Sequence, residues 1–259
     1  MDILCSKADG ILTMQFNRPE RKNAITAVMY QAMADALNDG EVDASVRAIL
    51  IIGLPEIFTA GNDLEDFMKT ARPGADEAIE ERPVFRFMRA LSGASKPVVA
   101  AVSGAAVGIG TTLLMHCDLV YAADNAKFSM PFVQLGLCPE FASSLLFTQL
   151  AGYPRAAEKL MLGEAFLAQE ALQMGLVSKV LPLDELIPYA TRQAAKLVAL
   201  PAASIRATKQ LMKASRATPI VDTMAVENKL FGAMLLAPEA KEAFTAFFEK
   251  RKPDFSKFA

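Results

Sequence analysis

The sequence predicts an α/β fold with mainly parallel strands, followed by a helical C-terminal region. Two β-branched runs, "RAILII" at 47–52 and "KPVVAAVSG" at 96–104, have the composition of strands that are buried on both faces. Helical patterns lie between and after these runs, and an alternation of strand, crossover helix and strand is typical of a parallel sheet.

The first half of the chain supplies most of the predicted strands. Residues 10–19 alternate in polarity and end at Arg18-Pro19, which indicates a strand that leads into a loop. Thr26 has the chemistry of an N-cap, and a helical apolar stripe follows it. The patterns further along predict, in order, a strand at 47–52, a helix near 77–93, a strand at 96–104, a helix at 108–116, and short strands at 117–124 and 126–130.

From residue 143 onward the patterns are mostly helical. They predict helices at 145–150, 155–162 and 169–174, then, after residues 177–181, three longer helices at 183–200, 203–216 and 220–236 and a last helix from Pro238. Leu200-Pro201 interrupts one helix before the next, so we expect two parts, a core of residues 1–200 and a helical region of residues 201–259. The tail is rich in Phe, Met and Leu, and such a face packs on its own core or on a neighbouring subunit.

Composition excludes several classes of function. A net charge of −2 supplies no basic field for nucleic acid or for an anionic membrane surface, and no apolar run is long enough to span a bilayer. The three cysteines lack the spacing of a metal site or of a disulfide framework. Together with the absence of a signal peptide pattern, these features lead us to expect a cytoplasmic protein.

Two glycine-bearing loops are candidate sites for chemistry. Residues 56–67, "EIFTAGNDLEDF", and residues 103–114, "SGAAVGIGTTLL", each lead from a strand into a helix. Backbone N–H groups at such a junction stabilise an anion or a developing negative charge, although a pair of tight structural turns would have the same pattern. The glycines of the second loop do not match G-x-G-x-x-G, so the sequence does not favour NAD binding.

The order of several motifs resembles the crotonase superfamily, the enoyl-CoA hydratase/isomerase family. The similar segments are "FNRPERKNAIT", "IFTAGNDLEDF", "KPVVAAVSGAAVGIGTTLLMHCDLVYAADNAKFSMPFVQLGL" and the terminal "FFEKRKPDF". The resemblance implies a crotonase-like spiral of ββα units with a C-terminal helical region that trimerises. It also implies an acyl-CoA thioester substrate, no cofactor other than the coenzyme A of that substrate, and a homotrimer or dimer of trimers.

The resemblance further implies an oxyanion hole for a thioester enolate. Carried over by motif, its two backbone N–H groups belong to Ala60 in "TAGND" and Ile109 in "VGIGT". Charge grows on the thioester oxygen as a proton leaves the α carbon, and donors of this kind are worth roughly 3–4 kcal/mol each.

The acids decide between the reactions of this family. Hydratases use two glutamates, at positions that correspond here to Thr112 and Phe132, so both are missing. Glu140, in "LGLCPEFASS", and the bulky Ile109 instead resemble the peroxisomal-type 3-enoyl-CoA to 2-enoyl-CoA isomerases. One carboxylate in an apolar setting, which would raise its pKa, is sufficient to move a proton from the α to the γ carbon. The competing interpretation is that Glu140 is a capping or surface acid.

Further residues are candidates through the resemblance alone. Those that would contact coenzyme A or the acyl chain are Lys22, Ala24, Asp63, Leu64, Phe132, Phe247 and Lys250. Ordinary surface or packing roles compete for Lys22 and Phe247, and helix capping competes for Asp63. We expect a structural role for His116, the single histidine, and backbone hydrogen bonding for Asp118. Residues 69–83 are expected to cover the acyl pocket.

Three functions therefore remain open on the sequence. Isomerisation of 3-enoyl-CoA to 2-enoyl-CoA is favoured, because a single acid serves that reaction. Enoyl-CoA hydratase is the first alternative, and a non-catalytic acyl-CoA binding module is the second.

Overall fold

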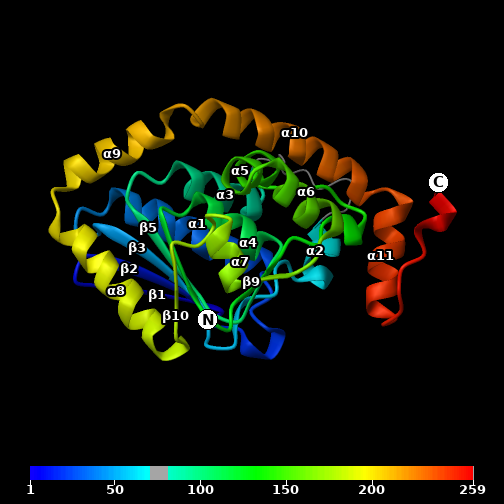
Figure 1. The fold of residues 1–259 in the computed structure, drawn as a ribbon, viewed down its shortest axis with the longest axis horizontal. Coiled ribbons are helices and arrows are strands. Elements are labelled where there is room, and N and C mark those ends of the chain that lie inside the picture. The colour runs from blue at the N-terminus through cyan, green and yellow to red at the C-terminus, as the bar shows by residue number, and fades with distance from the viewer. Residues whose placement is uncertain (71–80, 259) are drawn as a thin grey trace.

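A six-stranded sheet forms the centre of the computed structural model, which describes residues 1–70 and 81–258 (Figure 1). Its strand order is β1-β2-β3-β5-β7-β10, and its strands are β1 (Ile3–Ala8), β2 (Ile11–Phe16), β3 (Ala48–Ile52), β5 (Val98–Val102), β7 (Leu119–Ala123) and β10 (Lys179–Leu181). β1 and β2 are antiparallel, and the other neighbours are parallel, as predicted. The β1 strand was not predicted; Asp9 and Gly10, with φ of 50° and 79°, form the turn between it and β2.

A second, smaller sheet follows the first along the chain. Its order is β4-β6-β8-β9, with β4 (Ile57–Thr59), β6 (Ala105–Val107), β8 (Lys127–Ser129) and β9 (Phe166–Leu167). β3 continues into β4, β5 into β6 and β7 into β8, so the chain alternates between the two sheets and then enters a helical segment. This repeated ββα unit is the predicted spiral. Gly104, at φ 62°, marks one crossing, because its Cα lies against the Glu56 carbonyl where a β carbon would not fit.

The two faces of the large sheet bury different sets of side chains. Alternate residues point to opposite faces, so Ile49 and Ile51 of β3 join the larger hydrophobic cluster, while Ala48 and Leu50 join the smaller one. Helix α8 (Leu183–Ala199) covers the smaller cluster. Helices α1 (Ala27–Val42) and α3 (Pro83–Gly93) pack against each other on the larger cluster.

The remaining helices agree closely with the predicted ones. They are α2 (Leu64–Thr70), α4 (Ile109–Thr112), α5 (Ser143–Ala151), α6 (Tyr153–Leu162), α7 (Ala168–Gln173), α9 (Ala202–Ala214), α10 (Ala217–Leu235) and α11 (Pro238–Phe248), with short 3₁₀ turns η1 (Pro19–Arg21), η3 (Leu113–His116), η4 (Val133–Leu135) and η5 (Phe255–Phe258). Thr26 caps α1, since its Oγ1 accepts a hydrogen bond of 3.3 Å from the Met29 amide. Of the segment 69–83 that was expected to cover the acyl pocket, residues 71–80 lie outside the described residues, and Pro83 begins α3.

The C-terminal helices arch over the α/β core (Figure 1). α8 ends at Ala199, and α9 begins directly after Pro201, where the sequence predicted a break. α10 packs on α5, and α11 on the η4 turn, so the tail contacts its own core. Among the helices of residues 1–70 and 81–258, none has the length and apolar content that crossing a membrane requires.

Candidate active site

The two glycine-bearing loops lie side by side at the carboxyl ends of β4 and β6. These strands are parallel, and Thr59 pairs with Ala106. A β carbon on Gly61, which has φ 84°, would lie 2.7 Å from the Val107 carbonyl oxygen, and one on Gly110 would clash with the Thr59 side chain. Glycine is required at both positions for this close approach. Ala60 lies between these contacts on one loop, and Gly108 and Ile109 lie between them on the other, so the structure brings the two predicted oxyanion donors into adjacent loops.

The backbone amides of Ala60 and Ile109 differ in whether they already donate a hydrogen bond. Ile109 is the first residue of α4, a position without an intrahelical acceptor, and its N–H donates to no acceptor within residues 1–70 and 81–258. The Ala60 amide donates to the Lys22 carbonyl at 3.0 Å. An acyl oxygen at this place would therefore meet one uncommitted amide and one that must be shared with Lys22 or released from it.

Glu140 lies next to the second of these loops. Its side chain is buried at 6% exposure, and its Oε1 accepts a 2.5 Å hydrogen bond from the Thr112 hydroxyl. Thr112 is one helical turn beyond Ile109, so the carboxyl group is bound to the same short helix whose first amide is uncommitted. The second oxygen, Oε2, has no hydrogen-bond partner among the residues that the structure describes. The alternative of a surface acid is thereby excluded for Glu140.

The environment of Glu140 favours its protonated form. Burial raises its pKa, and the negative charge of Glu227 raises it further, while the hydrogen bond from Thr112 lowers it; the resulting pKa is about 8. Phe132 and Phe141 are buried in the same hydrophobic cluster, as the sequence predicted for the setting of this acid. An acid with a pKa near 8 is able both to accept and to donate a proton near neutral pH.

A strained turn carries the Glu140 side chain. The next two residues, Phe141 and Ala142, have positive φ angles of 58° and 55°, which are unfavourable for residues with a β carbon. Ser143 closes the turn, because its amide and hydroxyl donate to the Glu140 carbonyl at 3.1 and 2.6 Å. His116 binds the Phe141 carbonyl at 2.8 Å and stacks on its ring with centroids 3.8 Å apart.

A second buried glutamate, Glu227 of α10, approaches this turn from the C-terminal tail. Its carboxylate accepts hydrogen bonds from the amides of Ala142 (2.6 Å) and Ser144 (3.1 Å) and from the Ser144 hydroxyl (2.5 Å). Glu227 was not among the residues predicted from the sequence. Its neighbours Asn228 and Lys229 are typical of a solvent-facing helix, so a single sequence gave no signal for it.

Comparison with known proteins decides the family. A family model described as enoyl-CoA hydratase/isomerase matches residues 6–257. The chain belongs to the enoyl-CoA hydratase/isomerase family. This agrees with the crotonase-like fold and makes the protein an enzyme of that family.

Relatives within the family differ in their reactions. The chain is 33% identical to a crotonyl-CoA hydratase of Syntrophomonas wolfei, over 98% of this chain and 97% of that protein. It is 35% identical to enoyl-CoA delta isomerase 2 of Rattus norvegicus, over 97% of this chain and 64% of that protein. A crystal structure of an enoyl-CoA hydratase/isomerase from Pseudoalteromonas atlantica superimposes with a TM-score of 0.93 at 37% identity, covering 99% of this chain and all of the other. Family membership alone therefore leaves hydratase and isomerase open.

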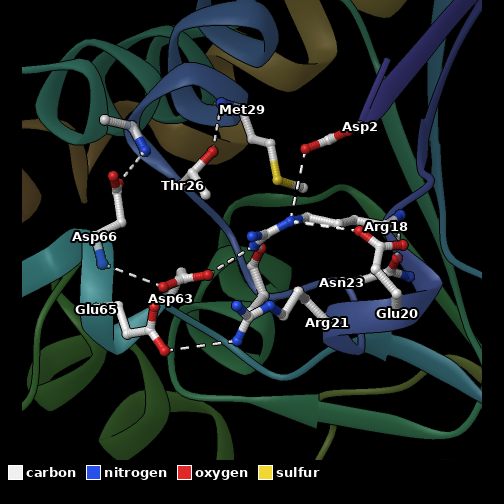
Figure 2. A network of polar contacts seen from close by, with 12 residues as sticks. Asp2, Arg18, Glu20, Arg21, Asn23, Thr26, Met29, Asp63, Glu65 and Asp66 are labelled. Atoms are coloured by element: carbon white, nitrogen blue, oxygen red, sulfur yellow. Dashed lines mark hydrogen bonds and ion pairs between the residues drawn. The ribbon is translucent and has the colours of Figure 1, made fainter.

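The segment predicted to contact coenzyme A is tied to the first glycine-bearing loop. The Arg18 guanidinium binds the Asp63 carboxylate at 2.7 Å, and Asp63 also accepts a hydrogen bond of 3.1 Å from the amide of Asp66; Figure 2 shows both contacts. Asp63 thus caps α2, as the competing interpretation expected, and the Arg18 guanidinium is one cause that lowers its pKa. Arg21 approaches Glu65 at 3.6 Å in the same network (Figure 2).

The other predicted contacts of this family with coenzyme A lie around that network or on the tail. Lys22 is exposed at φ 51°, and the Ala24 carbonyl accepts from Arg18 at 2.9 Å. The remaining residues fall into two groups: Leu64 and Phe132 pack in the core, and Phe247 and Lys250 are exposed on the tail. Coenzyme A contacts at these residues stay predictions.

Two residues expected to be structural have that role. His116 is buried at 2% exposure, and burial lowers its pKa to about 3, so the ring is neutral. Asp118 accepts the Val98 amide at 2.8 Å, as predicted. It also forms a 2.6 Å ion pair with Lys209 of α9, which links the tail to the sheet and was not predicted. Within the described part of the chain, no cluster of His, Cys, Asp or Glu is suited to a metal ion, and the three cysteines are free thiols.

Proposed function

We propose that this protein is an acyl-CoA isomerase that moves the double bond of a 3-enoyl-CoA to the 2-position. The observation that carries the proposal is the state of Glu140. It is a buried carboxyl group with one oxygen held by Thr112, which lies one helical turn beyond Ile109, and the other without a partner among the described residues. A group in this state is available to a proton of the substrate.

The proposed reaction uses Glu140 as base and then as acid. Its carboxylate takes a proton from the α carbon, and the electrons of that C–H bond move into a dienolate whose negative charge rests on the thioester oxygen. The amides of Ile109 and Ala60 would stabilise this charge. The protonated Glu140 then returns the proton to the γ carbon, the carbonyl forms again, and the double bond lies between the α and β carbons. Nothing is oxidised or reduced, so the step requires no cofactor beyond the coenzyme A of the substrate.

The immediate surroundings of Glu140 favour isomerisation over hydration. Hydration requires a second polar group to hold water, and the two positions that the resemblance assigns to hydratase glutamates carry Thr112 and the buried Phe132. The Thr112 hydroxyl already donates to Glu140. Glu227 does not replace the missing acid, because both of its oxygens accept hydrogen bonds from the turn.

The same proposal includes coenzyme A binding and assembly. Lys22, Ala24, Asp63 and Leu64 would line the path of the nucleotide and pantetheine portions, since Asp63 and Leu64 belong to the first glycine-bearing loop and the segment of Lys22 and Ala24 contacts it. Phe247 and Lys250 would reach the coenzyme A of a neighbouring subunit. The exposed Phe247 and Phe248, at 58% and 45%, support an interface with a neighbouring subunit, which the resemblance implies is that of a homotrimer or a dimer of trimers.

The test supplies 3-hexenoyl-CoA and 2-hexenoyl-CoA separately to the purified protein. An isomerase converts the first to the conjugated thioester, whose absorbance rises, and hydrates the second far more slowly. Efficient loss of conjugated 2-hexenoyl-CoA instead would assign the hydratase reaction. Tight binding of both thioesters without turnover would assign a binding module. Glu185→Gln is the matched control, because Glu185 is exposed on α8, which covers the opposite face of the sheet.

A further inference from the structure

The turn after Glu140 is held by a residue from the C-terminal tail. We propose that Glu227 is a positioning residue for the reaction. By accepting hydrogen bonds from residues 142 and 144, it fixes the direction of the Glu140 side chain without touching the substrate. The inference deepens the proposed function and rests on it, since it assigns to α10 a part in the chemistry at Glu140.

The backbone beside Glu140 requires such support. The left-handed region is unfavourable for residues with a β carbon, so Phe141 and Ala142 hold this conformation only where their surroundings enforce it. A relaxed turn would rotate the peptide that follows Glu140. The carboxyl group would then leave Thr112 and the loop that carries Ile109.

Two side chains hold the peptide group between Phe141 and Ala142, one at its carbonyl oxygen and one at its N–H. His116 binds the carbonyl of Phe141, and Glu227 binds the amide of Ala142. Glu227 also receives the amide and hydroxyl of Ser144, at the first turn of α5, which has no side-chain cap of its own. A carboxylate is suited to this place, because it accepts all three bonds without presenting a donor.

The arrangement also places charge near Glu140. The titratable groups around it are Tyr30 of α1, the neutral His116 of η3, Cys138 on its own segment, and Glu227 of α10. Of these, Glu227 is the group whose negative charge raises the pKa of Glu140, while burial raises the pKa of Tyr30 and of Cys138 and keeps both uncharged near neutral pH. Loss of the Glu227 charge should therefore lower the pKa of Glu140.

The test compares Glu227→Gln with Ser144→Ala and the Glu185→Gln control. Glutamine keeps the size of the side chain but turns an N–H₂ group toward a backbone amide. We expect Glu227→Gln to lower kcat for 3-hexenoyl-CoA by about 10–100-fold with KM changed less than about twofold, since small misplacements of a catalytic group have effects of this size. Ser144→Ala removes one of the three bonds, so its kcat should fall only about threefold.

A second readout does not depend on activity. The infrared C=O band of the protonated Glu140, assigned by its loss in Glu140→Gln, should titrate at lower pH in Glu227→Gln than in the wild type. If the wild type isomerises nothing, the proposed function fails, yet this titration still decides whether Glu227 acts on Glu140. An unchanged kcat and an unchanged band in Glu227→Gln would overturn the inference and leave Glu227 as a helix anchor. If that variant does not fold, an unchanged kcat in Ser144→Ala overturns it instead.

Discussion

Glu140 and Glu227 are two glutamates in almost equal burial, at 6% and 5% exposure, and yet the structure uses them differently. Glu227 accepts three hydrogen bonds that account for both of its oxygens. Glu140 accepts one, and its Oε2 is the buried side-chain oxygen without a partner in the described part of the chain. Burial raises the pKa of both groups, to about 8 for Glu140.

The two carboxyl groups differ in whether an oxygen without a hydrogen-bond partner among the described residues remains to accept a proton. Burial raises the pKa of Glu227 and its hydrogen bonds oppose that rise, but those bonds occupy both of its oxygens, so Glu227 acts as a structural tie. A buried oxygen without such donors costs free energy in the folded state, and it keeps the proton affinity that a catalyst needs. On the proposed function, the two glutamates therefore differ by their hydrogen bonds rather than by their burial: one is the reactive acid, and the other supports it.

The largest expected effect comes from removing the reactive acid. Glu140→Gln keeps the side-chain volume and removes the group that accepts the proton, so isomerase activity should fall by about 10³–10⁴-fold. Initial rates with 3-hexenoyl-CoA measure this loss. Activity within about tenfold of the wild type would show that another group moves the proton.

The same variant should remain folded. The pKa of Glu140 is raised in the folded state, so its contribution to stability is present at low pH and is lost as pH rises through about 8. Glu140→Gln has no such charge, and its thermal unfolding temperature at about pH 8.5 should be equal to or above that of the wild type. A drop there would attribute the lost activity to unfolding.

The next effect concerns pH. The base must be ionised to accept the proton, so kcat/KM should rise with pH up to the Glu140 pKa of about 8 and level off above it. Below that pKa the expected slope is roughly tenfold for each pH unit. The profile in buffers of constant ionic strength tests this. A profile that is flat through this range would contradict a base with the pKa that this environment creates.

The smallest expected effect comes from removing the Thr112 hydroxyl, which donates the single hydrogen bond that Glu140 accepts from the described side chains. Thr112→Val is close in volume and removes the hydroxyl that lowers the Glu140 pKa, so kcat/KM at neutral pH should fall by about tenfold and the inflection should move to higher pH. Thr111→Val is the matched control. The Thr111 hydroxyl binds the Ala106 and Ser129 carbonyls, so its loss should lower stability and leave the pH profile in place.

The local pattern of apolar and polar residues was sufficient to predict most helices and strands of the fold. Helices α8 and α10, the cap at Thr26 and the buried strands β3 and β5 were predicted within a few residues, because burial repeats with the period of a helix or a strand. Strands β4, β6 and β9 were not predicted as strands. They have two or three residues each, too few for any period to show, and pairing with neighbouring strands defines them.

Within the candidate site, the sequence by itself determined which residue types are present and which are missing. It placed Glu140 in an apolar segment, put Thr112 and Phe132 where the resemblance expects the two hydratase acids, and brought two glycine-bearing loops to the ends of strands. Only the tertiary structure decided that Glu227 holds the turn after Glu140, that the Ala60 amide meets the Lys22 carbonyl, and that Oε2 is left unpaired. The physical reason is distance along the chain. A sequence pattern reports neighbours within a turn or a strand, whereas the bond from Ala142 to Glu227 spans 85 residues and depends on how α10 packs on α5.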